Sequence, residues 1–314
     1  MAGGSSAQAP RFGAIDVGSN TVHLLVAECD GKTLRAVTDE STRLGLGADV
    51  ARGRAITPAK IAAAAATVRS YVVRAQKERA KELWLVGTQA VRAAVNGDKL
   101  AKEVERAAGL PLHVIEPAVE ARLGCQGTTL DKTERTSRLI VDIGGGSTQL
   151  SFAAADGKFR FLGSLPVGSV ALPTRYLLHD PPSKLARERL ELAVREAVAT
   201  LDLETVTHLQ PEYGILIGGV GRRLARAGRL GSGEPLVRLW VERLVEAVMG
   251  VSGETMEVFG AARLEDVNMI RAGAVILREA MAAFELQYCR VSNNGIREGA
   301  ILSMARGEDV ISGH

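Results

Sequence analysis

Short apolar runs bounded by polar and glycine residues occur in two sets of three, one at the start of the chain and one near its middle. Each set has the β-branched and aliphatic residues typical of strands. The first set covers residues 11–17, 22–28 and 32–37, and the second covers residues 138–143, 149–155 and 159–166. Asp-Gly pairs at residues 30–31 and 156–157 are hairpin signals inside the two sets. The pattern therefore predicts two antiparallel three-stranded units, which indicates a duplicated fold.

Helical periodicity follows each set of strands. Pro58 stands in the first-turn position that favours proline, and we expect its helix to run to about Lys81. Residues 41–47 show no periodicity and predict a loop. Strands that alternate with helices after an antiparallel start indicate mixed α/β sheets. We expect further strands at 83–87, 112–115, 213–217 and 288–292, and further helices from residue 88 and at 117–130, 183–203, 234–249, 253–259, 266–284 and 300–306.

The first turn of each set joins an aspartate to glycines and small hydroxyl residues. Residues 16–21 read Asp-Val-Gly-Ser-Asn-Thr, and residues 142–149 read Asp-Ile-Gly-Gly-Gly-Ser-Thr-Gln. Glycines let backbone N–H groups converge on an anion, and a carboxylate can hold a hydrated cation beside it. One such turn is as well explained by an ordinary hairpin. Two of them predict half-sites that face each other across a cleft and hold one phosphate-bearing ligand.

Other nucleotide-binding patterns are excluded. Neither glycine turn opens directly into a helix, as a dinucleotide-binding turn would, and no G-x-x-x-x-G-K-[ST] loop is present. Further anion contacts are predicted where arginines follow strand ends: Thr88 with Arg92, Arg43, and the three arginines after Gly218-Gly219. The ordinary alternative at each of these places is a helix cap with a surface arginine.

Composition and charge narrow the class of protein. The 314 residues have room for two domains, and 46% hydrophobic with 24% charged residues is typical of a soluble globular chain. The net charge of +3 is too small to indicate nucleic acid. Three widely spaced cysteines suggest reduced thiols in the cytoplasm, and the five scattered histidines predict no zinc site. We expect residues 1–10 to form a mobile tail, and no segment to cross a membrane.

Eight motifs, taken in order, resemble the exopolyphosphatase / guanosine pentaphosphate phosphohydrolase (Ppx/GppA) family. They span nearly the whole chain, and each is weak alone while the ordered set is specific. The matching residues are Asp16-Val17-Gly18-Ser19-Asn20-Thr21, Arg43-Leu44-Gly45, Thr88-Gln89-Ala90-Val91-Arg92, Glu120-Ala121-Arg122-Leu123, Asp142-Ile143-Gly144-Gly145-Gly146-Ser147-Thr148, Gly218-Gly219, Ala272-Gly273-Ala274 and Gly295-Ile296-Arg297-Glu298-Gly299.

The resemblance implies an α/β fold of the sugar kinase/actin/Hsp70 type, with two ribonuclease-H-like domains and the active site in the cleft between them. The length resembles that of the short, two-domain members. We expect residues 1–118 together with 291–314 to form domain I, and residues 119–290 to form domain II. The implied activity is release of terminal orthophosphate from inorganic polyphosphate, hydrolysis of pppGpp to ppGpp, or both, with Mg²⁺ or another divalent cation. A homodimer would extend a basic channel for a long chain.

The resemblance also implies residue roles. Glu120 matches the glutamate that orients the attacking water, and Asp142 and Arg92 complete the catalytic set. The metal would be held by Asp16, Asp142 and Gln149. The phosphate contacts would come from Gly18, Ser19, Asn20, Arg43, Thr88, Gly144, Gly145, Gly146, Ser147 and Thr148.

Two departures from the family pattern leave an alternative open. Gln149 replaces the glutamate that ends the second glycine motif, and Val119 replaces the first of two glutamates near the hinge. A glutamine keeps an oxygen ligand but loses the negative charge and the ability to accept a proton. The alternative is a polyphosphate or alarmone binder that has lost most of its hydrolysis. A third reading, a sugar kinase of the same superfamily, has less support because no adenosine-and-sugar apparatus is evident.

Overall fold

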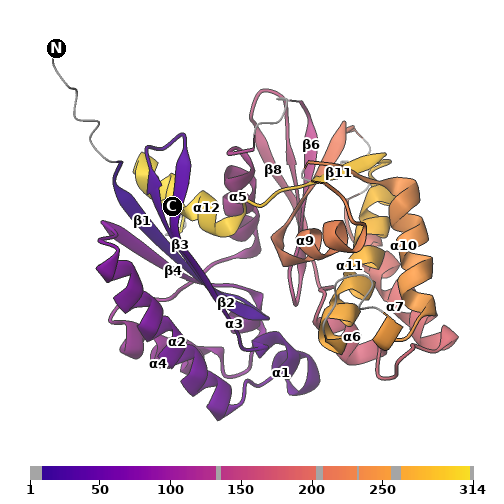
Figure 1. Ribbon diagram of the computed structural model, residues 1–314, viewed down its shortest axis with the longest axis horizontal. Coiled ribbons are helices and arrows are strands. Elements are labelled where there is room, and N and C mark those ends of the chain that lie inside the picture. Colours follow the sequence, from indigo (N-terminus) through magenta and orange to yellow (C-terminus); the bar gives the residue numbers. More distant parts are fainter. Residues whose placement is uncertain (1–8, 132–135, 203–207, 232, 256–262, 312–314) are drawn as a thin grey trace.

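The computed structural model describes residues 9–131, 136–202, 208–231, 233–255 and 263–311. Two mixed sheets stand side by side, each covered by helices (Figure 1). We call the five-stranded sheet with its helices the first lobe, and the six-stranded sheet with its helices the second lobe. The predicted tail at residues 1–10 and the predicted helix at 253–259 lie largely outside the described residues.

The first sheet has the strand order β3-β2-β1-β4-β5. β1 pairs antiparallel with β2 and parallel with β4, so that the chain leaves β1 and β4 at the same edge. Helices α2 and α4 cover one face of this sheet, where Val68 and Leu100 share a buried cluster with Ile15. The elements are β1 (Arg11–Val17), β2 (Thr21–Cys29), β3 (Leu34–Arg43), α1 (Leu46–Gly53), α2 (Pro58–Lys77), β4 (Glu82–Gly87), α3 (Gln89–Ala93), α4 (Gly97–Ala108) and β5 (His113–Val114).

The second sheet repeats this order with one strand added. Its order is β10-β11-β9-β6-β7-β8, in which β6 pairs antiparallel with β7 and parallel with β9. β6 and β9 correspond to β1 and β4, which confirms the predicted duplication. The elements are β6 (Arg138–Ile143), β7 (Thr148–Ala153), β8 (Phe159–Leu165), α6 (Ala171–Tyr176), α7 (Lys184–Ala199), β9 (Tyr213–Ile217), α9 (Gly218–Ala227), β10 (Leu236–Val237), α10 (Arg238–Gly250), α11 (Leu264–Ala283) and β11 (Tyr288–Val291).

Two helices join the lobes. α5 (Pro117–Thr128) lies between the sheets (Figure 1), with Leu123 in a buried cluster of the first lobe and Cys125 in one of the second. α12 (Ile296–Arg306) returns from the second lobe and packs on β1 and β2, where Ile301 shares that first-lobe cluster. The two helices touch through backbone: a methyl group on Gly299 would collide with the carbonyl of Leu123. This close contact fixes how α5 and α12 cross, and the two lobes are joined at this crossing.

Several elements differ from the expectations. The predicted loop at residues 41–47 is wrong, because β3 continues to Arg43 along the full length of β2, and α1 begins at Leu46. The helix predicted from residue 88 is two helices: α3 ends at Ala93, and α4 begins at Gly97 with Leu100 and Val104 buried. α7 begins one residue after its cap, Ser183, whose hydroxyl accepts a hydrogen bond from the N–H of Ala186 at 3.2 Å.

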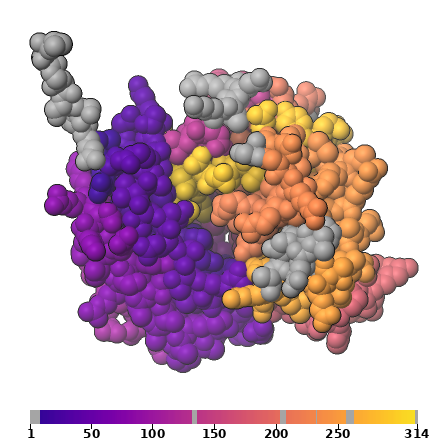
Figure 2. Space-filling model, viewed as in Figure 1, coloured from indigo at the N-terminus to yellow at the C-terminus, as the bar shows by residue number. Residues whose placement is uncertain are grey.

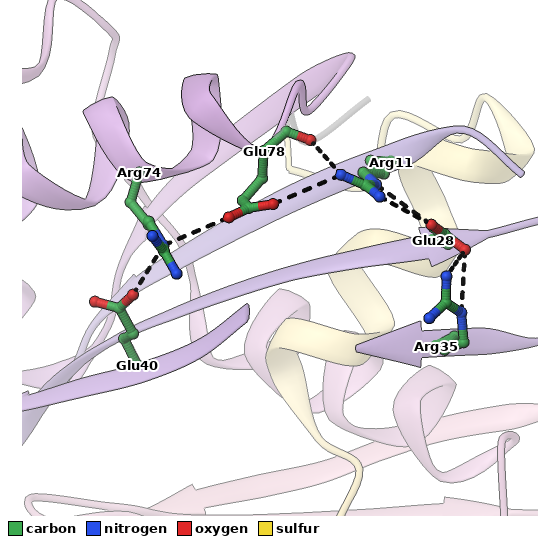
Figure 3. A network of polar contacts seen from close by, with 6 residues as sticks. All are labelled: Arg11, Glu28, Arg35, Glu40, Arg74 and Glu78. Atoms are coloured by element: carbon green, nitrogen blue, oxygen red, sulfur yellow. Dashed lines mark hydrogen bonds and ion pairs between the residues drawn. The ribbon is translucent and has the colours of Figure 1, made fainter. Parts of the chain in front are cut away.

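A chain of six charged side chains ties the end of α2 to the first sheet (Figure 3). Arg11 lies 3.2 Å from Glu28 and 3.6 Å from Glu78, and Arg74 lies 3.2 Å from Glu40. Such partly exposed pairs contribute little individually. Together they link the end of α2 to β1, β2 and β3.

Within the described residues, all three cysteines are buried and unbonded to one another, as expected for core thiols. No described helix combines the length and the apolar content that a membrane-spanning segment needs.

Candidate active site between the lobes

The two aspartate–glycine turns face each other across one cleft. The carboxyl ends of β1 and β4 meet at one edge of the first sheet, and those of β6 and β9 meet at the matching edge of the second. Side chains of both edges line a cleft of about 790 Å³. The space-filling view shows the molecule hollowed between the two lobes (Figure 2). Ligands commonly bind beyond the carboxyl ends of parallel strands.

The turns approach closely enough to close one end of the cleft. The Ser19 hydroxyl donates to Gln89 Oε1 at 3.1 Å, and a Cβ on Gly145 would lie 2.8 Å from Ser19 Cβ. A side chain at Gly146 would have to displace the amide of Gln89, which occupies that space. Gln89 therefore connects the two glycine turns. It lies inside the Thr88–Arg92 motif but had no predicted role.

Three acidic side chains converge in the cleft. Asp16 lies at the end of β1, Asp142 at the end of β6, and Glu120 one turn into α5; all three line the cleft. Burial raises the pKa of Asp142 to about 8, with further increases from the charges of Glu120 and Asp16. Burial raises the pKa of Asp16 to about 7, and Glu120 adds to this while Arg297 opposes it. Concentrated, poorly hydrated negative charge of this kind attracts a cation.

The residues present fit a divalent cation. Asp16 Oδ1 and Gln149 Oε1 are buried and accept no hydrogen bond, so each has a lone pair available to a metal. No three acidic, histidine or cysteine side chains are grouped as a closed metal cage in the described part of the chain. Magnesium does not need one, because it is usually held by one or two carboxylates, waters and the phosphates of the substrate.

Glu120 is held from behind by Arg92. Arg92 Nη2 lies 3.0 Å from Glu120 Oε2, and another nitrogen of the same guanidinium donates to the carbonyl of Ile115. Burial raises the pKa of Glu120, while the charge and hydrogen bond of Arg92 lower it. Arg92 is not among the residues that line the cleft. Its predicted contact with phosphate stays a prediction, since in this structure it positions Glu120.

The predicted phosphate residues divide into two groups. Those that line the cleft are Gly18, Ser19, Asn20, Arg43, Thr88, Gly144, Gly145, Gly146 and Ser147. Thr148 does not line it; its side chain is fully buried and donates to the carbonyl of Val167 at 2.8 Å. Thr148 therefore supports the second turn from below.

Gln149 lies beneath the same turn. It is the register partner of Asp142 in the β6–β7 ladder, so the two side chains share a face of the sheet. Its amide nitrogen donates to Ser147 Oγ at 2.7 Å and to Ser164 Oγ at 3.3 Å. Gln149 is not among the residues that line the cleft; it is buried behind Ser147, which does line it, and its side-chain oxygen has no partner.

Arg43 is engaged across the cleft. Its guanidinium lies 2.7 Å from Asp266 Oδ1 of α11, and the same oxygen lies 3.2 Å from Arg223 of α9. This ion pair links the end of β3 in the first lobe to the second lobe. A phosphate contact by Arg43 requires that it leave Asp266.

The lining extends beyond the predicted phosphate residues, to the Gly218-Gly219 motif that the sequence already indicated and to residues of α11 that it did not. Gly218 follows β9 with φ of +88°, which favours glycine, and a Cβ there would lie 3.2 Å from Asp142 Oδ1. Asp266 and Met269 enter from α11, far away in sequence. For the arginines after Gly218, the sequence predicted either anion contacts or an ordinary solvated helix. The structure places Arg222, Arg223 and Arg226 in the cleft lining, together with Arg263.

Comparison with known proteins gives consistent matches. A model of the Ppx/GppA phosphatase family matches residues 25–308. The chain is 29% identical over 308 residues to Exopolyphosphatase 1 of Mycobacterium leprae, covering 93% of this chain and 88% of that protein. An exopolyphosphatase structure from Cytophaga hutchinsonii matches with a TM-score of 0.85 at 21% identity, covering 96% of this chain and 99% of the other. The Ppx/GppA member of Aquifex aeolicus matches with a TM-score of 0.79 at 23% identity, covering 97% and 99%. Both structures confirm the predicted fold.

Proposed function

This chain belongs to the Ppx/GppA phosphatase family, and from that membership we propose that it releases terminal orthophosphate from inorganic polyphosphate. The observation that carries the proposal is the meeting of two aspartate–glycine turns with Glu120 in one cleft. The similar protein of Mycobacterium leprae bears the name of this activity. We also propose that pppGpp is hydrolysed at the same site, since both substrates end in the same phosphoric anhydride.

We propose Mg²⁺ as the ion, held by Asp16, Asp142 and Gln149. The unpartnered oxygens of Asp16 and Gln149 and the raised pKa of Asp142 support this set. When bound, the ion supplies positive charge to the oxygens of the reacting phosphate. Its charge would offset that of the polyphosphate end, which is densely charged.

The side chains of the cleft carry the other roles. Glu120 orients the attacking water and accepts its proton, and Arg92 fixes the carboxylate by the 3.0 Å contact. The backbone of Gly18–Asn20 and of Gly144–Ser147 holds the phosphates. Phosphoryl transfer depends mainly on positioning and on charge stabilisation, which is what these groups offer.

The test is a phosphate-release assay on long-chain polyphosphate and on pppGpp with and without Mg²⁺. We expect Glu120→Gln to lower kcat about a hundredfold to a thousandfold with little change in KM, because the amide cannot accept the proton. The fold should persist, since the amide oxygen still accepts from Arg92. Glu116→Gln, one turn earlier and exposed, is the matched control. Absence of phosphate release by the wild type at any Mg²⁺ concentration would refute the proposal.

A second candidate, a polyphosphate or alarmone binder with little turnover, is favoured by the buried neutral amide of Gln149 beside Asp142. Gln149→Glu adds a carboxylate to an already acidic site. We expect it to lower the melting temperature without metal and to enlarge the stabilisation by Mg²⁺, because the new charge needs the ion. If this candidate holds, the variant also gains turnover. Exposed Gln287→Glu is the control; equal responses of both variants to Mg²⁺ would exclude Gln149 from the metal set.

We also propose the domain limits 1–118 with 291–314, and 119–290. Packing of α12 on β1 and β2 supports the assignment of the closing segment to the first domain. The homodimer and the cytoplasmic location stay predictions from the sequence.

A further inference from the structure

The amide of Gln89 crosses from the first lobe to the second at the two glycine turns. Gln89 is the first residue of α3, directly after Thr88, which follows β4. Its Oε1 accepts the hydrogen bond from Ser19 of the first turn at 3.1 Å, and its carboxamide fills the space beside Gly146 of the second turn. One side chain of the first lobe therefore touches both half-sites, at a distance from the crossing of α5 and α12 that joins the lobes.

The second turn is also supported by its own lobe. The carbonyls of Gly144 and Gly145 accept hydrogen bonds from the N–H groups of residues 169–171 at 2.8 to 2.9 Å. A Cβ on Gly145 would nevertheless lie 2.8 Å from the Cβ of Ser19 in the first lobe. The second turn is thus held by a segment of its own lobe and by the Ser19–Gln89 pair of the other lobe.

This support decides where the N–H groups of the second turn lie. The N–H groups of Gly145 and Gly146 donate to no other group in the described part of the chain. Successive N–H groups of this kind form a concave site for an anion. Their carbonyl sides are already bound, so the groups can reach a phosphate on the first turn only if the two turns keep the right separation. A displacement of about 1 Å in such a site can lower the rate about a hundredfold.

We propose that Gln89 is a positioning residue that sets the distance between the two glycine turns, so that both turns hold the same terminal phosphate. The inference rests on the proposed phosphohydrolase function. Asp16 and Asp142 lie in β1 and β6, the strands that lead into these turns. The contact made by Gln89 therefore also fixes how far apart the two carboxylates stand, although Gln89 does not act on the reacting atoms itself.

The kinetic test compares Gln89→Ala with Gln76→Ala, which removes the same amide from an exposed position on α2. We expect Gln89→Ala to lower kcat about tenfold to a hundredfold, because a displaced turn loses its alignment with the reacting phosphate. KM should change little, since the groups that contact the substrate remain. The factor should be the same for tripolyphosphate, long-chain polyphosphate and pppGpp, because each presents a terminal phosphate. A raised KM at constant kcat would mean that Gln89 binds the substrate directly, and would overturn the inference.

A compensating substitution tests the contact between Gln89 and Gly146. Gly146 lies outside the left-handed region that favours glycine, so an alanine there chiefly displaces the amide of Gln89. We expect Gly146→Ala alone to lower kcat. In the Gln89→Ala background the added methyl group has room, and the double variant should be no slower than Gln89→Ala. Effects that multiply would show that the two residues act independently, against the proposal.

A distance measurement separates this inference from the proposed function. Spin labels on Lys102→Cys in α4 and Arg189→Cys in α7, both exposed and on the outer sides of the two lobes (Figure 1), report the distance between the lobes without any ligand. The three native thiols are buried, which directs the labels to the introduced cysteines. Gln89→Ala should lengthen or broaden the distance distribution, and Gln76→Ala should not.

The two proposals can fail separately. An unchanged distance distribution in Gln89→Ala would overturn the positioning role while leaving hydrolysis intact. A wild type that shows the expected change in distance but releases no phosphate would refute the hydrolase alone. Melting temperatures close to that of the wild type confirm that the variants fold.

Discussion

At the scale of single residues, the second lobe contains a guanidinium that is completely withdrawn from water. Arg271 donates to the carbonyls of Val248 at 2.8 Å and Val251 at 2.6 Å, and to Asp180 Oδ1 at 2.8 Å. Asn268, to which the sequence assigned no role, accepts from the same guanidinium at 2.9 Å. Burying a charge costs free energy unless its partners are complete. Asp180 therefore anchors α11, the helix that carries Asp266 to the cleft.

Asp180→Asn should destabilise the protein by about 2 kcal/mol at pH 7, because it leaves Arg271 buried without a counter-charge. Burial tends to raise the pKa of Asp180, but the N–H of Gly253 and the guanidinium of Arg271 outweigh it and hold the pKa below its ordinary value. The stabilisation is thus present at neutral pH and is lost as the pH falls through that lowered pKa.

Thermal melting from pH 7 down to pH 3 measures this effect. The gap in melting temperature between the wild type and Asp180→Asn should shrink as the pH falls. Exposed Asp156→Asn removes the same charge from a loop and should change the melting temperature little. A gap that stays constant with pH would contradict an ionic role for Asp180.

The strand and turn pattern predicted that Asp16 and Asp142 meet but not what surrounds them. Both line one cleft, and Glu120 lines it too, a placement that only the family resemblance implied. Thr148 lies below the turn rather than in it. Alternation along β7 decides which way its side chain points, and this cannot be predicted until the first residue of the strand is known. Arg43 contacts Asp266, more than 200 positions away in sequence. No local pattern contains such a contact.

At the scale of elements, the strands of the two sheets were predictable because both their spacing and their turns carry signals. β3 was predicted too short because its second half is polar and forms a strand only through its pairing with β2. α1 is short and follows Gly45, whose φ of +62° sets its direction. The helix predicted from residue 88 breaks between Ala93 and Gly97, and Leu100 and Val104 form the buried face of its second part, α4. No pattern within a single element predicts that α11 lies opposite the end of β3.

That placement leads to a prediction about Asp266, which occupies two arginines of the cleft at once. Asp266→Asn should raise the affinity for polyphosphate a few-fold, because Arg43 and Arg223 become available to the anion. Equilibrium binding at fixed ionic strength measures it, with Asp156→Asn as the control of equal charge change. An unchanged or lower affinity would mean that Asp266 holds these arginines in their binding positions instead of competing for them.

At the scale of the whole molecule, the relation of the lobes depends on the crossing of α5 and α12. Gly127 and Gly299 bring the two backbones together: a Cβ on Gly127 would meet the backbone of Gly295, as one on Gly299 would meet Leu123. Hydrogen bonds beside the crossing join Ser303 to Gln126 at 2.9 Å and Asn294 to Asp131 at 2.8 Å. The duplication was visible in the sequence, whereas this contact between distant segments was not.

Gly299→Ala should force the two helices apart and destabilise the protein by about 1–3 kcal/mol, because the obstacle is rigid backbone. Gly250→Ala is the matched control: no atom lies within 4 Å of its added methyl group. It should be neutral or slightly stabilising in the helix α10. Denaturant unfolding of both variants measures the difference. Equal stabilities would show that the crossing can widen freely.

The return of α12 to the first sheet also sets an order of events during synthesis. Phe12 and Leu25 leave the ribosome well before Ile301 and Leu302, which share their buried cluster. The strands of the second sheet and the helices that cover its outer face lie between residues 138 and 291, and that part of the chain can reach its native packing earlier. Until α12 is made, this face of the first sheet is covered only in part, by α5. A chain that is still attached to the ribosome at residue 290 is therefore expected to bind chaperones through β1 and β2 rather than through the residues just synthesised.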